Sequence, residues 1–100
     1  MKVYLSENTE SKLLLLTDYL KVKWSEKVKE DFIKKLTKKI SMISEFPQSC
    51  PESNDFKGLY KCVVSKQTTF YYRILFEKNE IEIITLFDTR QNPKNFPKDI

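Results

Sequence analysis

The chain has 100 residues, of which 40% are hydrophobic and 13% aromatic, and only one is glycine. This length gives room for one domain with one core, and the composition excludes an intrinsically disordered chain. The formal net charge of +4 at pH 7 favours an acidic partner: nucleic acid, an anionic membrane or an acidic protein segment. We expect a single domain over residues 1–100, with an irregular C-terminal tail from about residue 91.

The sequence also predicts a cytoplasmic protein. Its first ten residues lack the basic end and apolar run of a signal peptide, and the longest unbroken apolar stretch, Leu13 to Leu16, is too short to cross a membrane. The two cysteines, Cys50 and Cys62, do not resemble a disulfide framework, so reduced thiols are expected. Because the chain has no histidine, we expect no metal site, and nothing in the sequence indicates a cofactor.

The first half of the chain predicts a strand and two helices. Lys2 to Leu5 alternates between polar and apolar residues, as a short strand does. From Thr9 to about Val22 apolar residues recur at helical spacing, and Ser25 is suited to cap a second helix that ends near Phe46. In the first helix the apolar positions are Leu13, Leu15, Leu16, Tyr19, Leu20 and Val22. In the second they are Val28, Phe32, Ile33, Leu36, Ile40, Ile43 and Phe46.

The second half predicts a loop and a three-stranded antiparallel meander. Pro47 ends the second helix, and the run from Pro47 to Gly58 is rich in turn-forming residues. Strand-like runs follow at 59–65, 69–76 and 80–87, joined by short turns. The resulting order, β-α-α-β-β-β, indicates an α+β domain. In it a two-helix hairpin packs on one face of a small, mainly antiparallel four-stranded sheet.

Alternation along the strands predicts which side chains face away from the helices. Counted in this way, the last strand turns Ile81, Ile83, Thr85 and Phe87 inward and Glu82, Ile84, Leu86 and Asp88 outward. The expected outer group on the whole sheet is Lys61, Tyr71, Arg73, Asp88 and Arg90. Guanidinium groups match phosphate and carboxylate geometry. An ordinary Arg73–Asp88 ion pair across adjacent strands, with Tyr71 as surface packing, accounts equally well for the same pattern.

Three stretches, which together cover most of the chain, carry a family resemblance. They are SENTESKLLLLTDYL after the opening strand, VKEDFIKKLTKKISMISEFPQS from Val28, and FKGLYKCVVSKQTTFYYRILFEKNEIEIITLFDTRQNP from Phe56. In their order, their spacing and the EFP and FDTRQNP segments, they resemble the RelE/ParE superfamily. Its members are small bacterial toxins of type II toxin–antitoxin systems, also called the plasmid stabilisation family. The resemblance implies the RelE/ParE-like version of the α+β fold described above.

What the resemblance implies about function depends on the target. RelE-like members enter the ribosome and cut messenger RNA, whereas ParE-like members inhibit DNA gyrase without hydrolysing anything. Both are held inactive by a cognate antitoxin whose extended arm wraps the toxin, so a hetero-oligomer is implied and a homo-oligomer is possible. Position by position, Arg73 matches the strand arginine and Arg90 the terminal basic residue of RNA-cutting members. Lys57 and Lys61 fall where basic residues precede or enter the first meander strand.

This chain departs from the RNA-cutting pattern at the end of its last strand. Some RNA-cutting members have a histidine where this chain has Asp88, and others have a tyrosine beyond the terminal arginine, which is missing here. Metal-independent RNA cleavage needs a base, an acid and cations, and a positioned acid or base contributes ~10²–10⁴-fold. Asp88 is the best-placed base, but a carboxylate beside an arginine is a weak base. Tyr71 or Tyr72 is the remaining acid or base.

Gyrase inhibition needs only a binding surface, and the missing histidine does not affect it. We therefore expect a ParE-like poison that binds DNA gyrase. The alternatives are a RelE-like ribosome-dependent messenger RNA endoribonuclease and a non-toxic or repurposed binding domain. The catalytic residues, if the protein is RelE-like, are Arg73, Asp88 and Arg90. The expected target-binding residues are Lys57, Lys61, Tyr71, Arg73 and Arg90.

Overall fold

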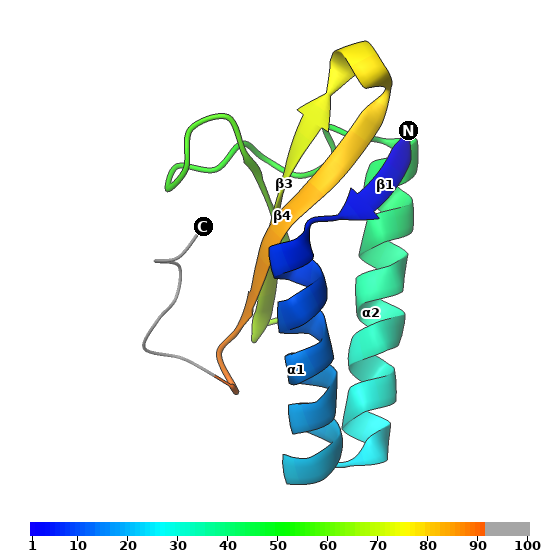
Figure 1. Cartoon of the computed structure of the whole chain (residues 1–100), viewed down its shortest axis with the longest axis vertical. Helices are drawn as coiled ribbons and strands as arrows, with labels where there is room; N and C mark the ends of the chain where they lie inside the picture. The colour runs from blue at the N-terminus through cyan, green and yellow to red at the C-terminus, as the bar shows by residue number, and fades with distance from the viewer. Residues whose placement is uncertain (92–100) are drawn as a thin grey trace.

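The structure, a computed structural model, describes residues 1–91 as a layer of two helices against a four-stranded sheet (Figure 1). The elements follow in the order β1 (Lys2–Leu5), α1 (Glu7–Lys23), α2 (Glu26–Glu45), β2 (Tyr60–Val63), β3 (Thr68–Leu75), a 3-10 turn η1 (Phe76–Lys78) and β4 (Glu80–Asp88). This is the predicted β-α-α-β-β-β order. The tail expected from about residue 91 lies outside the described residues.

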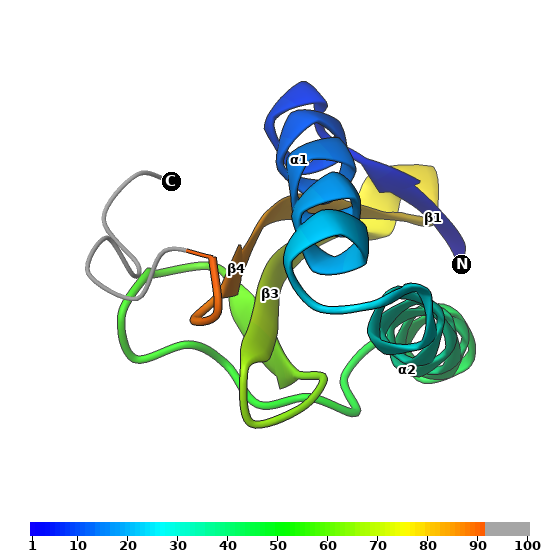
Figure 2. The same ribbon diagram turned by 90° about the horizontal axis from the view of Figure 1, so that it is seen from below.

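The sheet has the strand order β1-β4-β3-β2, with β1 parallel to β4 and the other neighbours antiparallel. Viewed along the helices, α1 and α2 lie on the same side of β3 and β4 (Figure 2). The core between the two layers includes Leu16, Leu20, Phe32, Leu36, Ile43, Cys62, Phe70, Tyr72, Ile81, Ile83 and Leu86. The predicted α+β fold, a helix hairpin on one face of a mainly antiparallel sheet, is confirmed.

α1 buries only a narrow stripe. Leu16 and Leu20, one helical turn apart, are 1% and 0% exposed. Leu15 and Val22 were expected to widen this stripe, but they are 64% and 76% exposed. Each residue turns the helix by about 100°, so side chains next to Leu16 in sequence leave the contact line with the sheet. An amphipathic pattern that is apolar on two sides does not show which side faces the core.

α2 follows the sequence more closely. Its predicted stripe is confirmed by the burial of Phe32, Leu36 and Ile43, whereas Ile33 and Phe46 remain 40% and 60% exposed. Neither helix within residues 1–91 is long and apolar enough to cross a membrane.

Ser25 caps the start of α2 as the sequence predicted, because its hydroxyl accepts a hydrogen bond from the Val28 backbone N–H at 3.0 Å. Replacing it with alanine leaves this N–H without its partner and should lower the free energy of unfolding by about 1 kcal/mol in urea denaturation. Ser11, an exposed serine within α1, provides the matched control. A Ser25→Ala loss no larger than that of Ser11→Ala would show that the cap does not stabilise the helix.

Residues 47–59, here called the strap, wrap around the β2 edge of the sheet. The strap begins on the helix side, where the Tyr72 hydroxyl donates to the Pro47 carbonyl at 2.7 Å. It forms an antiparallel bridge from Glu52 to Tyr60 and then continues toward the opposite face. Figure 2 shows this green segment leaving α2 and passing to the side of the sheet away from the helices. Gly58, at φ 84°, adopts the left-handed conformation that turns the strap into β2.

Candidate functional site

Three of the predicted site residues lie on the outer face of the sheet, the face away from α1 and α2. Lys61 stands opposite Tyr71 in the β2–β3 register, and Arg73 stands opposite Glu82 in the β3–β4 register. The alternation of β3 places Tyr71 and Arg73 on this face, because Phe70 and Tyr72, which alternate with them, point into the core. The prediction for these three residues is therefore correct in orientation.

Tyr71 was expected to be displayed on this face, and that expectation is wrong. The strap covers it: the Phe56 ring packs edge-on against the Tyr71 ring at 5.2 Å, and Tyr71 is 0% exposed. Its hydroxyl donates to the Asp55 carboxylate at 3.3 Å. Burial, followed by the negative charge of Asp55, raises the pKa of Tyr71 to about 12. The phenol therefore keeps its proton at neutral pH and lies beneath the surface.

Two cations of the outer face are paired with nearby acids. Arg73 contacts Glu82 at 2.7 Å from Nη2 and 2.9 Å from Nε, and its side chain remains 51% exposed. Lys61 lies 3.9 Å from Asp55. The Arg73–Asp88 pair considered from the sequence does not form. Lys57 is exposed on the strap, next in sequence to Phe56, whose ring packs against Tyr71.

A β-bulge changes the direction of the side chains along β4. Tyr71 pairs with Thr85 and the next residue, Tyr72, pairs with Ile83, which leaves Ile84 as an extra residue on β4. Beyond the bulge, alternation is inverted. Leu86 and Asp88 face the helices, opposite Phe70 and Thr68, whereas Thr85 and Phe87 turn to the outer face. The predicted orientations of these four β4 residues are therefore wrong.

Asp88 and Arg90 consequently belong to a different site from Arg73. Thr68, the partner of Asp88, lies five residues from Arg73 along β3, a distance of about 17 Å at the usual strand rise. The two arginines also lie on opposite faces of the sheet. The predicted outer group of five side chains does not converge.

Asp88 is the centre of a buried charged unit. Its side chain is 0% exposed and accepts Arg90 Nη2 at 2.7 Å and Arg90 Nε at 3.0 Å, a two-pronged ion pair. The Arg90 backbone N–H adds a bond at 2.9 Å, and the Thr68 hydroxyl donates at 2.5 Å. The Arg90 carbonyl in turn accepts the Tyr19 hydroxyl from α1 at 3.0 Å. These bonds join the end of β4 to β3 and to α1.

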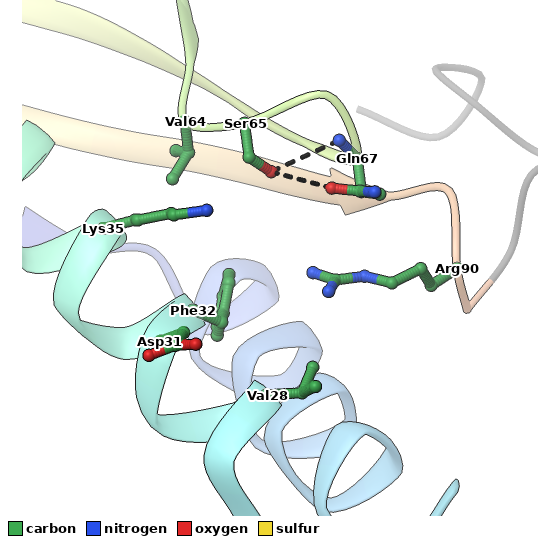
Figure 3. A pocket seen from close by; sticks show the side chains of 8 residues that line it. All are labelled: Val28, Asp31, Phe32, Lys35, Val64, Ser65, Gln67 and Arg90. Atoms are coloured by element: carbon green, nitrogen blue, oxygen red, sulfur yellow. Dashed lines mark hydrogen bonds between the residues drawn. The ribbon is translucent and has the colours of Figure 1, made fainter. Parts of the chain in front are cut away.

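The Arg90 guanidinium extends into a small cavity between α2 and the β2–β3 turn (Figure 3). The cavity has a volume of about 140 Å³, and its lining residues are Val28, Asp31, Phe32, Lys35, Val64, Ser65, Gln67 and Arg90. Figure 3 shows the Lys35 side chain reaching across from α2 toward Ser65. The sequence did not place Lys35 or Tyr19 in a site with Arg90, because only the fold brings these helix positions beside it.

The groups considered as acid or base are all enclosed. The Tyr72 hydroxyl lies in the core with its bond to Pro47, and burial together with Cys50 raises the pKa of Tyr72 above its ordinary value. Asp88 has its carboxylate oxygens occupied by Arg90 and Thr68. Within residues 1–91 no group of three or more acidic or cysteine side chains is placed to hold a metal ion. The exposed chemistry is that of cations: Lys57, Lys61 and Arg73.

The two-helix layer on a mixed sheet is the fold of several solved toxin structures. The chromosomal ParDE toxin–antitoxin system from P. aeruginosa aligns with a TM-score of 0.71 and 11% identity, covering 88% of this chain and 95% of that one. A YoeB/ParE toxin from Agrobacterium tumefaciens gives 0.64 and 14%, covering 88% and 98%. The E. coli RelBE toxin–antitoxin complex gives 0.56 and 20%, covering 87% and 94%. At these identities the likeness establishes the fold alone.

The sequence itself establishes the family. The profile of the ParE toxins of type II toxin–antitoxin systems (parDE) matches residues 3–93. The chain therefore belongs to the ParE toxin family, as the sequence resemblance indicated. No curated protein sequence matches it significantly.

Proposed function

We propose that this toxin acts as a ParE-like poison, which binds DNA gyrase and hydrolyses nothing. The observation that supports this proposal is the enclosure of the candidate base. Asp88 is fully buried and saturated by Arg90 and Thr68, so a ribose 2′-hydroxyl cannot approach its oxygens. A binding poison does not need such a group.

The RNA-cutting alternative would depend on the outer-face cations and on a phenol as acid or base. Tyr71 fits that role poorly, because it is covered by Phe56 and its pKa of about 12 is far from neutral. The chain has no histidine, and its last tyrosine is Tyr72. Lys57, Lys61 and Arg73 could still stabilise the charge on a phosphate, but these cations suit the binding of an acidic surface equally well.

The experiment that separates these functions induces the toxin in bacterial cells without an antitoxin. Plasmid supercoiling and the integrity of a reporter messenger RNA are measured in the same cultures. We expect growth arrest with loss of supercoiling while the messenger RNA stays intact. Cleaved messenger RNA with normal supercoiling would instead support the RelE-like ribonuclease. Normal growth with neither change would identify a non-toxic or repurposed binding domain.

We infer that the outer face carries the target-binding residues, because Lys57, Lys61 and Arg73 are gathered there on the strap, β2 and β3. Replacing all three with alanine should raise the toxin concentration needed for half-maximal gyrase inhibition about tenfold or more, equivalent to about 1.4 kcal/mol of binding. The matched control replaces Lys27, Lys34 and Lys38, which are exposed on α2 and carry the same total charge. Equal losses in both variants would show that only net charge matters.

We further propose a cognate antitoxin as partner, bound partly by strand addition at β2. This strand forms one edge of the sheet, and the strap occupies that edge by its bridge to Tyr60. Val63, two residues after Lys61, is 54% exposed, and its backbone points to the same edge as that of Lys61. A peptide rich in acidic and apolar residues would pair there and neutralise the nearby cations.

A further inference from the structure

The two cysteines of the chain, which the proposed function does not use, lie together at the base of the strap. Cys62 is in β2, and Cys50 is in the strap, directly after the turn that follows α2. They are 1% and 7% exposed. Both thiols are free, and Cys50 lies close enough to Cys62 to contribute, after burial, to the raised pKa of the Cys62 thiol.

The backbone register explains why the two thiols meet. The Glu52–Tyr60 bridge is enclosed by hydrogen bonds from Ser53 N–H to the Leu59 carbonyl at 2.7 Å and from Lys61 N–H to the Pro51 carbonyl at 2.9 Å. Such a pair is the narrow, non-hydrogen-bonded type. Extended by two residues, the register of this bridge would place Cys50 opposite Cys62, again as a narrow pair. Narrow pairs have Cα atoms about 4.5 Å apart, within the 4.4–6.8 Å span that a disulfide accommodates.

We propose that Cys50 and Cys62 form an oxidation site, at which a low-molecular-weight disulfide closes an intramolecular disulfide between the strap and β2. The register of the Glu52–Tyr60 bridge places the two residues within the reach of a disulfide, so the bond should need little displacement of the strap or of β2. The proposal does not depend on which target the toxin inhibits.

The reaction proceeds by two thiol–disulfide exchanges. The Cys50 thiolate, which is the more exposed, attacks one sulfur of the small disulfide, forms a mixed disulfide and releases one small thiolate. Cys62 then loses its proton and attacks the Cys50 sulfur, which releases the second small thiolate. Two protein thiols are oxidised, one small disulfide is reduced to two thiols, and the two protons pass to those thiols. Burial and the Cys50 contact raise the pKa of Cys62, so the second step should accelerate as pH rises.

The bond would fasten the part of the strap that shapes the outer face. The closed ring runs from Cys50 to Cys62 and contains Asp55, Phe56 and Lys57. Asp55 and Phe56 hold Tyr71 beneath the strap, and Lys57 is one of the exposed cations. Oxidation therefore fixes the strap against β2 without changing any group proposed to contact the target.

The test uses the purified full-length chain in glutathione redox buffers, with and without denaturing urea. After acid quenching and alkylation, trypsin separates the cysteines, because Lys57 and Lys61 lie between them. We expect one disulfide linking the two cysteine peptides in the native protein, reversed by reductant. The effective concentration of one thiol relative to the other should be at least about tenfold higher in the native protein than in urea. A bond that suits the folded state is favoured by folding. A smaller ratio, stable mixed disulfides or intermolecular dimers would overturn the proposal.

Single-cysteine variants test the order of attack. Cys62→Ser should accumulate a persistent glutathione adduct at Cys50, because no second thiol resolves it, whereas Cys50→Ser should react at least about tenfold more slowly through the deeply buried Cys62. Equal adduct formation in both variants would refute the assigned route. If either variant fails to fold, the native-against-urea comparison of the unaltered chain still decides whether the site exists.

Discussion

Asp88→Ala is expected to lower the free energy of unfolding by about 3–5 kcal/mol, since removing one partner of a buried ion pair leaves the other charge uncompensated. Asp88 is 0% exposed at its side chain, and Arg90 is only 15% exposed. The substitution also strips Thr68 of its hydroxyl acceptor and releases the turn that Arg90 holds against Tyr19 of α1. Urea denaturation followed by the fluorescence of the single tryptophan, Trp24, would measure the loss.

The same molecule contains a matched pair at its surface. Arg73 and Glu82 join a guanidinium to a carboxylate at the same 2.7 Å, but the arginine side chain is 51% exposed. Glu82→Ala should therefore change the free energy of unfolding by no more than about 1 kcal/mol. A similar loss in Glu82→Ala and Asp88→Ala would show that burial is not what makes the Asp88–Arg90 pair important.

Alkaline pH should destabilise the protein through Tyr71. Folding raises the pKa of this phenol from 10 to about 12, so the folded state favours the protonated form. The stabilisation is complete below pH 10 and is lost as pH rises through about 12. This difference corresponds to roughly 3 kcal/mol. We expect the free energy of unfolding to fall by about that amount over this range, with a further decrease from Tyr72, whose pKa is also raised.

Two variants separate the causes of the Tyr71 shift. Tyr71→Phe abolishes this residue's share of the alkaline loss, and at neutral pH it removes only the 3.3 Å bond to Asp55. Asp55→Asn removes the carboxylate charge but leaves burial under Phe56, so it should reduce the alkaline loss without eliminating it. The tyrosinate absorbance of the wild type minus that of Tyr71→Phe reports Tyr71 directly. A transition near pH 10 in the folded protein would contradict the prediction.

Arg73 and Arg90 lie on opposite faces of the sheet and therefore belong to separate sites in this toxin. Arg90 and Asp88 join β4 to β3 and α1, which is a structural role, and Arg90 also reaches the cavity beside Lys35. Arg73 stands on the outer face with Lys61 and Lys57. Both arginines match positions of the RNA-cutting members in sequence, but on opposite faces of the sheet they cannot contact the same phosphate. A binding surface on the outer face is compatible with this separation.

Local patterns in the sequence were enough to predict the elements and the fold class. The helical spacing of Phe32, Leu36 and Ile43, the cap at Ser25 and the stop at Pro47 depend on neighbours within one or two turns. The β3–β4 turn is likewise local, because Asn79 supplies the left-handed residue at φ 55°. These signals also fixed the orientation of Lys61, Tyr71 and Arg73, since β3 contains no irregularity.

Only the tertiary structure determined where Asp88 and Arg90 point, because the bulge at Ile84 is held by contacts distant in sequence. Where β1 ends and α1 begins, the Ser6 backbone N–H bonds the Ile83 carbonyl at 3.0 Å, and the Ser6 hydroxyl bonds the Ile84 carbonyl at 2.8 Å. Thr9 adds a bond from its hydroxyl to Ile83 at 2.8 Å. One extra residue turns every later side chain of a strand to the opposite face of the sheet, and counting by alternation does not detect it. The covering of Tyr71 by the strap is also a contact between residues distant in sequence, so local patterns did not predict it.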